Sequence, residues 1–150
     1  MTNTVVVGVD RSEGARAALR FAAEEAKLRR AKLRVVHAWQ YSAAGTAGVE
    51  SFYPAVGVEV REVRDAAEQA LAETLRSALS DADPREVEQR VVEGRAAGVL
   101  VNESRDADLL VVGSRGRGGF SGLLLGSVSQ QVSHHAACPV VIVRPTEGSA

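Results

Sequence analysis

The chain has 150 residues, of which 45% are hydrophobic and 25% are charged, as in one ordinary globular domain with its own core. Its net charge of −1 excludes a global field that would draw it to nucleic acid or to an anionic membrane. Cys138 is the only cysteine, which excludes an internal disulfide framework and favours a reducing compartment. The first residues lack the pattern of a signal peptide and no apolar run has transmembrane length. We therefore expect a cytoplasmic protein without nucleic-acid or membrane partners.

The first part of the chain predicts a strand, a helix and a second strand. Residues 4–9 (TVVVGV) form a β-branched run typical of a strand buried on both faces. Asp10 follows, and Ser12 with Glu13 marks a helix start. The next apolar residues recur with the period of a helix, at Ala15, Ala18, Leu19, Ala22 and Ala26. Residues 33–38 (LRVVHA) predict the second strand.

Residues 39–57 interrupt this rhythm with three glycines and a proline among small polar residues. So long a loop is either functional or mobile in a compact domain. The rhythm then resumes, and the remaining elements are expected to be helices over 58–80, 96–104 and 127–136 and strands over 87–93, 109–112 and 140–143.

Strands that alternate with helices of crossover length predict an α/β fold with right-handed connections. We expect one domain over 1–150, a Rossmann-like, doubly wound sheet of five parallel strands with helices on both faces. Ligands of such sheets bind at the carboxyl ends of the strands. Here those ends include Asp10 after the first strand and Gly113 after the fourth.

A glycine-rich stretch separates the fourth strand from the last helix, with six glycines in the 14 residues 113–126. Glycines let backbone N–H groups approach a phosphate, and a helix start adds free donors and a positive dipole end. A flexible surface loop is the alternative, but six glycines directly after a strand exceed what a turn requires. The sequence has neither GxxxxGK[ST] nor a GxGxxG after the first strand. We therefore predict phosphate binding at this stretch.

The spacing of three of these glycines is specific. Gly113, Gly116 and Gly126, followed at once by Ser127, read G-x2-G-x9-G-S, and Ser129 adds a hydroxyl two places later. This pattern resembles the nucleotide signature of the universal stress protein family, in its ATP-binding branch. The segment VVVGVDRSEGARAALRFAAEEA is similar to the family's opening strand and first helix, and CPVVIVR is similar to its closing strand. The resemblance spans residues 4–144.

The resemblance implies a strand order of 3-2-1-4-5, which makes the first and fourth strands neighbours. It also implies ATP, accompanied by Mg²⁺, as the ligand. Asp10 is then expected near the ribose or the metal and phosphates, and the backbone of Ala38 near the adenine. The cofactor-binding residues that it implies are Gly8, Val9, Asp10, Ala38, Gly113, Ser114, Arg115, Gly116, Gly126, Ser127, Val128 and Ser129.

Three side chains in this set have a simpler alternative. Asp10 can form an Asx turn or cap the first helix, and that role is compatible with a ligand nearby. Ser127 can cap the last helix. Arg115 can be a solvated loop charge. No catalytic residue and no set of metal-ligating side chains are predicted.

Three functions stay open on the sequence alone. The first is an ATP-binding regulatory protein of the universal stress type, which acts through a partner and is not an enzyme. The second is a slow ATPase or phosphotransferase, although the chain lacks the lysine of a Walker motif. The third is a nucleotide-free interaction module. In each case the apolar strand at 140–143 is expected to lie at the edge of the sheet and to pair two copies into a homodimer.

Overall fold

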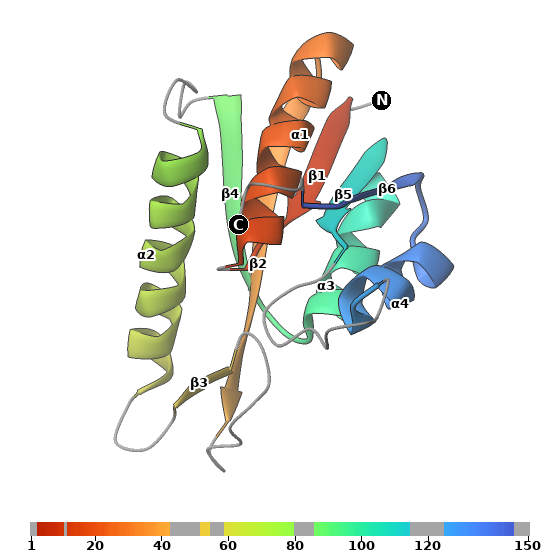
Figure 1. Ribbon diagram of the computed structural model, residues 1–150. Coiled ribbons are helices and arrows are strands. Elements are labelled where there is room, and N and C mark those ends of the chain that lie inside the picture. The colour runs from red at the N-terminus through yellow and green to blue at the C-terminus, as the bar shows by residue number, and fades with distance from the viewer. Residues whose placement is uncertain are drawn as a thin grey trace.

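The computed structural model describes residues 3–10, 12–42, 52–54, 59–79, 86–114 and 125–145. Its centre is a parallel sheet in which five strands lie in the order β4-β2-β1-β5-β6 (Figure 1). Their bounds are β1 (Thr4–Gly8), β2 (Lys32–Ser42), β4 (Val87–Glu93), β5 (Leu109–Gly113) and β6 (Val140–Val143). In order of sequence this is 3-2-1-4-5, so the predicted fold class and strand order are confirmed.

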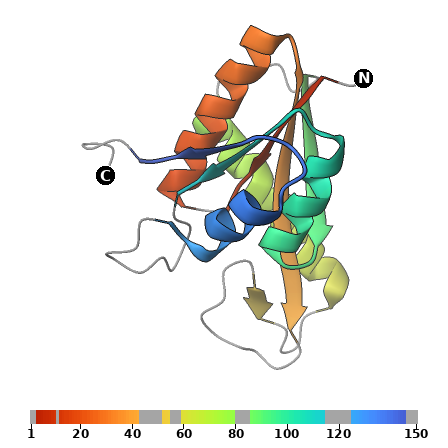
Figure 2. The same ribbon diagram turned by 90° about the vertical axis from the view of Figure 1, so that its right-hand side faces the viewer.

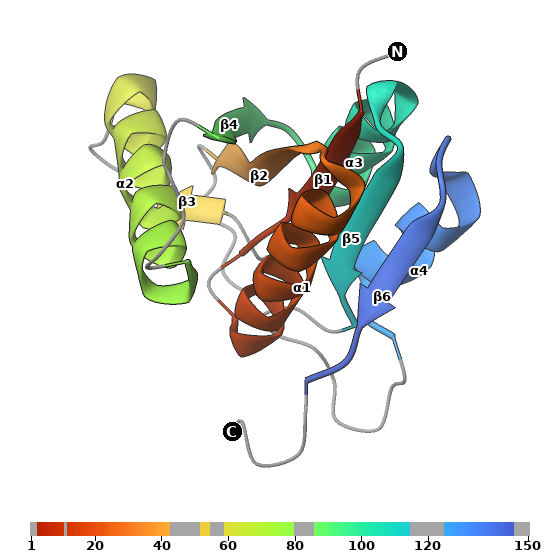
Figure 3. The same cartoon turned by 90° about the horizontal axis from the view of Figure 1, so that it is seen from above.

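The four α-helices in the described part of the chain cover the two faces of the sheet (Figure 3). On one face lie α1 (Glu13–Arg29) and α2 (Val60–Ala78). On the other lie α3 (Ala96–Glu103), which continues into the 3-10 turn η2 (Ser104–Asp106), and α4 (Ser127–His135). This arrangement is the doubly wound one that strictly alternating elements require.

The central strand β1 shows why a continuous β-branched run is needed. Val5 and Val7 pack toward α1, whereas Val6 packs toward α3 and α4, and all three side chains are fully buried. The stripe of alanines on α1, which includes Ala18 and Ala22 at 0% exposure, lets that helix sit close to the sheet.

The structure corrects the sequence prediction around residues 39–57. The second strand does not end at Ala38 but continues to Ser42, and a sixth, three-residue strand, β3 (Phe52–Pro54), pairs with this extension. The extension has a packing reason, since Trp39 is 3% exposed and lies against Val63 and Ala67 of α2. Packing against α2 therefore stabilises β2 beyond the apolar residues that predicted it.

Candidate functional site

The carboxyl ends of β1 and β5 lie side by side. Val5 is in register with Leu109, and Val7 with Val111, so β1 ends beside β5. On its other side β1 pairs with β2, where Gly8 is in register with Val36. The predicted adjacency of the first and fourth strands, β1 and β5, is thus confirmed, and both strands run through the centre of the sheet in Figure 2.

Hydrogen bonds to β2 hold the end of β1 in place. The Val9 N–H donates to the Val36 carbonyl at 2.9 Å, and Nδ1 of His37 lies 3.0 Å from the Val9 carbonyl oxygen. Because a carbonyl only accepts, His37 carries its proton on Nδ1 in this contact. The His37 side chain is 4% exposed and lies within β2, so it is a buried histidine inside the strand. Ala38, implied as the adenine contact, follows directly and is also buried.

Asp10 and Ser12 form the turn into α1. Asp10 Oδ1 accepts from the Ser12 N–H at 2.8 Å, and Ser12 Oγ accepts from the Ala15 N–H at 3.1 Å. The Asx turn and the helix cap considered for this segment are therefore both present. They leave Asp10 half-buried at the carboxyl edge of the sheet, and its implied part in ligand binding stays a prediction.

Two glycines at the strand ends are required by close packing. A Cβ on Gly113 would lie 3.0 Å from the carbonyl oxygen of Gly14, so the end of β5 meets the backbone of α1. A Cβ on Gly8 would lie 2.5 Å from a methyl carbon of Leu100 in α3. The first glycine of the motif thus brings α1 close to β5, a role that its spacing alone did not indicate.

The middle of the glycine-rich stretch, with the implied site residues Arg115 and Gly116, lies outside the described residues. Description resumes at residue 125, and α4 begins one residue after its N-cap, Gly126, which offers no side-chain cap. Ser127 is the first helical residue and is exposed, so it does not cap the helix.

The start of α4 presents hydrogen-bond donors that have no acceptor within the helix. Its first intrahelical bond runs from the Gln130 N–H to the Gly126 carbonyl at 3.0 Å. The N–H groups of Ser127, Val128 and Ser129 precede that bond and have no acceptor within the helix. Together with the helix dipole they form a start suited to an anion.

Ser114 and Ser129 are each 2% exposed, unlike Ser127. The Ser114 N–H donates to the Val143 carbonyl at 2.8 Å, and the Ser114 carbonyl accepts from the Gly126 N–H at 2.6 Å. Ser129 Oγ donates inward, to the Ser114 carbonyl at 2.9 Å and the Gly126 carbonyl at 3.0 Å. The resemblance had implied Ser129 as a cofactor-binding residue, and the sequence had no signal for these buried partners of its hydroxyl.

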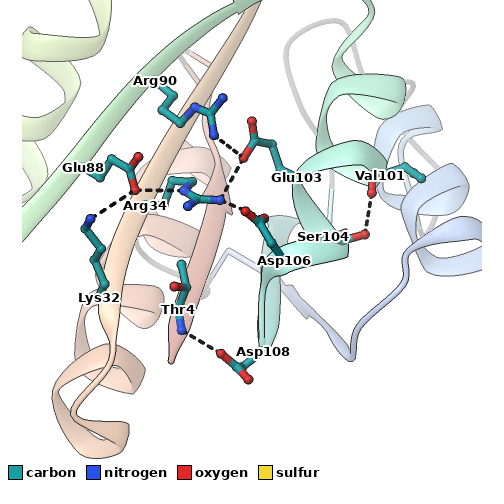
Figure 4. A network of polar contacts seen from close by, with 10 residues as sticks. All are labelled: Thr4, Lys32, Arg34, Glu88, Arg90, Val101, Glu103, Ser104, Asp106 and Asp108. Atoms are coloured by element: carbon teal, nitrogen blue, oxygen red, sulfur yellow. Dashed lines mark hydrogen bonds and ion pairs between the residues drawn. The ribbon is translucent and has the colours of Figure 1, made fainter. Parts of the chain in front are cut away.

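A network of charges that sequence reasoning missed lies at the opposite, amino ends of the strands (Figure 4). Arg34 of β2 contacts Glu88 at 2.9 Å, Asp106 at 3.0 Å and the buried Glu103 at 3.1 Å. Glu103 also accepts from Arg90 at 3.1 Å. The sequence did carry one signal for this network: Arg34 is a charged residue inside a mostly apolar predicted strand, two residues before the buried Val36. The network ties α3 and η2 to β2 and β4 and is remote from the carboxyl-end site.

This network shifts the acid–base properties of two members. Burial alone would lower the pKa of Arg34, but hydrogen bonds and charges from Glu88 and Asp106 outweigh it, so the pKa is raised. Burial alone would likewise raise the pKa of Glu88. The hydrogen bond from Arg34 and the charges of Arg34, Lys32 and Arg90 outweigh that effect, so the Glu88 pKa lies below its ordinary 4.5.

Outside the implied site, the described residues form a hollow, but neither a cluster of metal-ligating side chains nor a helix able to span a membrane. A hollow of about 410 Å³ between α2 and β4 is lined by Arg64, Glu68, Leu71 and residues 89–92, and contains none of the implied site residues. In the part of the chain that the structure describes, no group of three His, Cys, Asp or Glu residues is placed to hold a metal ion. Nor does any described helix combine the length and the apolar character needed to cross a bilayer.

Comparison with known proteins identifies the class to which this fold and site belong. Residues 1–144 match the model of the universal stress protein family. The chain therefore belongs to that family.

Several relatives are similar over nearly the whole chain. A universal stress protein of Mycobacterium tuberculosis is 40% identical over 140 residues, which cover 93% of this chain and 45% of that protein. One of Mycolicibacterium smegmatis is 36% identical over 141 residues, 94% of this chain and 45% of that protein. The chain thus spans about half the length of these curated relatives.

Solved structures show the same fold. The UspA protein of Lactobacillus plantarum superimposes with a TM-score of 0.75 at 23% identity, covering 95% of this chain and 97% of that one. A universal stress protein solved in complex with cAMP has a TM-score of 0.58 at 31% identity, covering 94% and 95%.

Proposed function

We propose that this chain binds an adenine nucleotide, ATP with Mg²⁺, at the carboxyl ends of β1 and β5, and that the bound nucleotide governs its contact with a protein partner in a stress response. The observation that carries the proposal is the start of α4. Three N–H groups without intrahelical acceptors follow a residue that has no side chain to cap them. A triphosphate satisfies these donors and the helix dipole together.

The other residues of the site supply complementary surfaces. The end of β1 and Ala38 of β2 place backbone at the carboxyl edge of the sheet, where nucleotides bind in folds of this kind. Asp10 provides one carboxylate at the carboxyl edge of the sheet, and Mg²⁺ in nucleotide sites typically uses one or two carboxylates together with phosphate oxygens. That a relative at 31% identity was solved with cAMP supports an adenine-containing ligand.

We infer that ATP is held here and not rapidly turned over. Phosphoryl transfer needs an oriented nucleophile and cationic groups beyond a phosphate cradle, and the sequence has no Walker lysine. A nucleotide that is retained changes the protein by favouring one conformation over another. A regulatory role fits a site that binds without reacting.

We further propose that two copies pair through β6. Among the described strands β6 pairs with β5 alone, and its four residues remain half-buried. Pro139 and Pro145 flank it and limit the length of an added strand. Sedimentation velocity over a range of concentrations tests this pairing, with a dimer expected and a monomer at all concentrations contradicting it.

The nucleotide proposal is tested by extracting the purified protein with acid and identifying the released small molecule by mass spectrometry. We expect an adenine nucleotide from the wild type and none from Gly126→Asp, whose carboxylate would repel phosphate at the helix start. Gly98→Asp in α3 is the control, because it adds the same charge where no atom lies within 4 Å of a new Cβ. Equal retention by all three proteins would reject this site, and an empty wild type that also fails to bind added ATP would reject the function.

A further inference from the structure

We propose that Ser129 is a positioning residue, which fastens together the two ends of the glycine-rich stretch so that the start of α4 faces the ligand. This inference rests on the function proposed above and adds a role for one hydroxyl. Ser114, Gly126 and Ser129 are here called the loop neck. The chain leaves β5 at the first of these residues and returns to α4 at the second.

The loop neck is joined by hydrogen bonds that meet on one carbonyl. The Ser114 oxygen accepts from the Gly126 N–H at 2.6 Å and from Ser129 Oγ at 2.9 Å. The Ser129 hydroxyl has one proton and shares it with the Gly126 carbonyl at 3.0 Å, as a three-centre bond. It therefore touches both ends of the stretch at once.

The loop neck is also anchored to the sheet. The Ser114 N–H donates to the carbonyl of Val143, the last residue of β6. Both backbone polar groups of Ser114 are thus used, and Ser114 and Ser129 are each 2% exposed. Water cannot easily replace the Ser129 hydroxyl at such a site, so removing it leaves the Ser114 carbonyl short of a partner.

Two consequences follow for the ligand. A hydroxyl held between two carbonyls is not directed at a phosphate, which leaves Ser127, exposed at the same helix start, as the serine available to the nucleotide. The contribution of Ser129 is instead to fix Gly126, and with it the first-turn N–H groups, relative to β5. Backbone donors bind a charged group well only when neighbouring residues hold them at the right distance and angle.

The same helix provides a matched control. Ser133 Oγ donates to the Gln130 carbonyl three residues earlier at 2.7 Å, as Ser129 does to Gly126. Ser133→Ala and Ser129→Ala therefore remove the same kind of intrahelical bond and make the same change in side chain. Only Ser129→Ala also removes the bond to Ser114.

The first experiment measures amide hydrogen exchange in the nucleotide-free proteins. The Gly126 N–H reports opening of the loop neck directly, and the amide of Val6 in the central strand reports global unfolding. We expect Ser129→Ala to speed exchange of Gly126 about five- to tenfold relative to Val6, and Ser133→Ala to leave this ratio unchanged. An unchanged ratio in Ser129→Ala overturns the proposal, whether or not nucleotide binds.

The second experiment compares ATP with adenosine by titration calorimetry. If Ser129 positions the phosphate donors, Ser129→Ala weakens ATP binding about five- to tenfold and leaves adenosine binding within about twofold of wild type. A merely structural role would weaken both ligands alike, and that result overturns the proposal. Failure of the wild type to bind either ligand would reject the proposed function, while the exchange ratio would still decide the role of Ser129 in the loop neck.

Discussion

Substituting Gly8 with alanine should show how closely α3 is packed against the end of the central strand. The new Cβ would lie 2.5 Å and 2.9 Å from the two methyl carbons of Leu100, whose side chain is 4% exposed. Carbon atoms pack comfortably at about 3.5 Å or more, so Leu100 must retreat by about 1 Å within a filled core. Overpacking of this kind costs about 1–3 kcal/mol of folding free energy.

The assay is urea unfolding at fixed protein concentration without nucleotide, since ligand and association both shift apparent stability. Gly98→Ala is the matched control, because its Cβ meets nothing within 4 Å and Gly98 lies inside helix α3. That substitution should stabilise the protein by about 0.5–1 kcal/mol. The two alanines should therefore have effects of opposite sign.

A double-mutant cycle identifies Leu100 as the cause. Leu100→Ala alone should cost about 2–5 kcal/mol through the cavity that it leaves. If the added methyl of Gly8→Ala fills part of that cavity, the double variant is less destabilised than the sum of the singles by about 1 kcal/mol or more. Strict additivity, or a Gly8→Ala protein as stable as wild type, would refute the packing argument.

Three further outcomes are expected. Glu103→Gln should lower the free energy of unfolding by about 1–3 kcal/mol, because a neutral side chain replaces the buried carboxylate that accepts from two arginines. The exposed control Glu68→Gln should lower it by less than about 1 kcal/mol. Equal effects of the two substitutions in urea unfolding would contradict this prediction. The pKa of Glu88 is lowered below 4.5 in the folded protein, so the ionised Glu88 stabilises the fold above pH 4.5, and this contribution is lost as the pH falls through the folded pKa. Glu88→Gln should therefore reduce the loss of unfolding free energy at acid pH. An unchanged loss would count against the ion pair between Glu88 and Arg34. Burial, with the charge of Asp108, raises the pKa of the Cys138 thiol above its ordinary 9.0. Iodoacetamide at pH 7 should therefore label the folded chain more slowly than the urea-unfolded chain, because the thiolate is the reactive form. Equal labelling rates would contradict a raised pKa.

The fold was accessible from the sequence because its main signals are local. The near-continuous β-branched run at 4–9 predicted a strand buried on both faces, and Val5, Val6 and Val7 are fully buried. Helix-length segments between strands then impose a parallel, doubly wound sheet. The strand extension to Ser42 was missed because it depends on Trp39 packing against α2, a contact between segments far apart in the chain.

The candidate site was accessible only in part. The start of α4 lies directly after the last glycine of the motif, as predicted, and anion binding there stays a prediction. Spacing does not reveal what each residue does there. Gly113 is a glycine because α1 packs against it, and Ser129 directs its hydroxyl inward because the loop neck offers two carbonyls. Both roles depend on contacts between residues that are distant in the sequence.

The most direct test of the account is a nuclear magnetic resonance titration of the ¹⁵N-labelled protein with ATP and Mg²⁺, followed amide by amide. Nucleotide at the carboxyl ends of β1 and β5 predicts that the largest shifts fall on Gly8 to Asp10 and on Gly126 to Ser129, with little change at the amino-end network around Arg34. Shifts confined to the hollow between α2 and β4, or no shift at millimolar ATP, would contradict it.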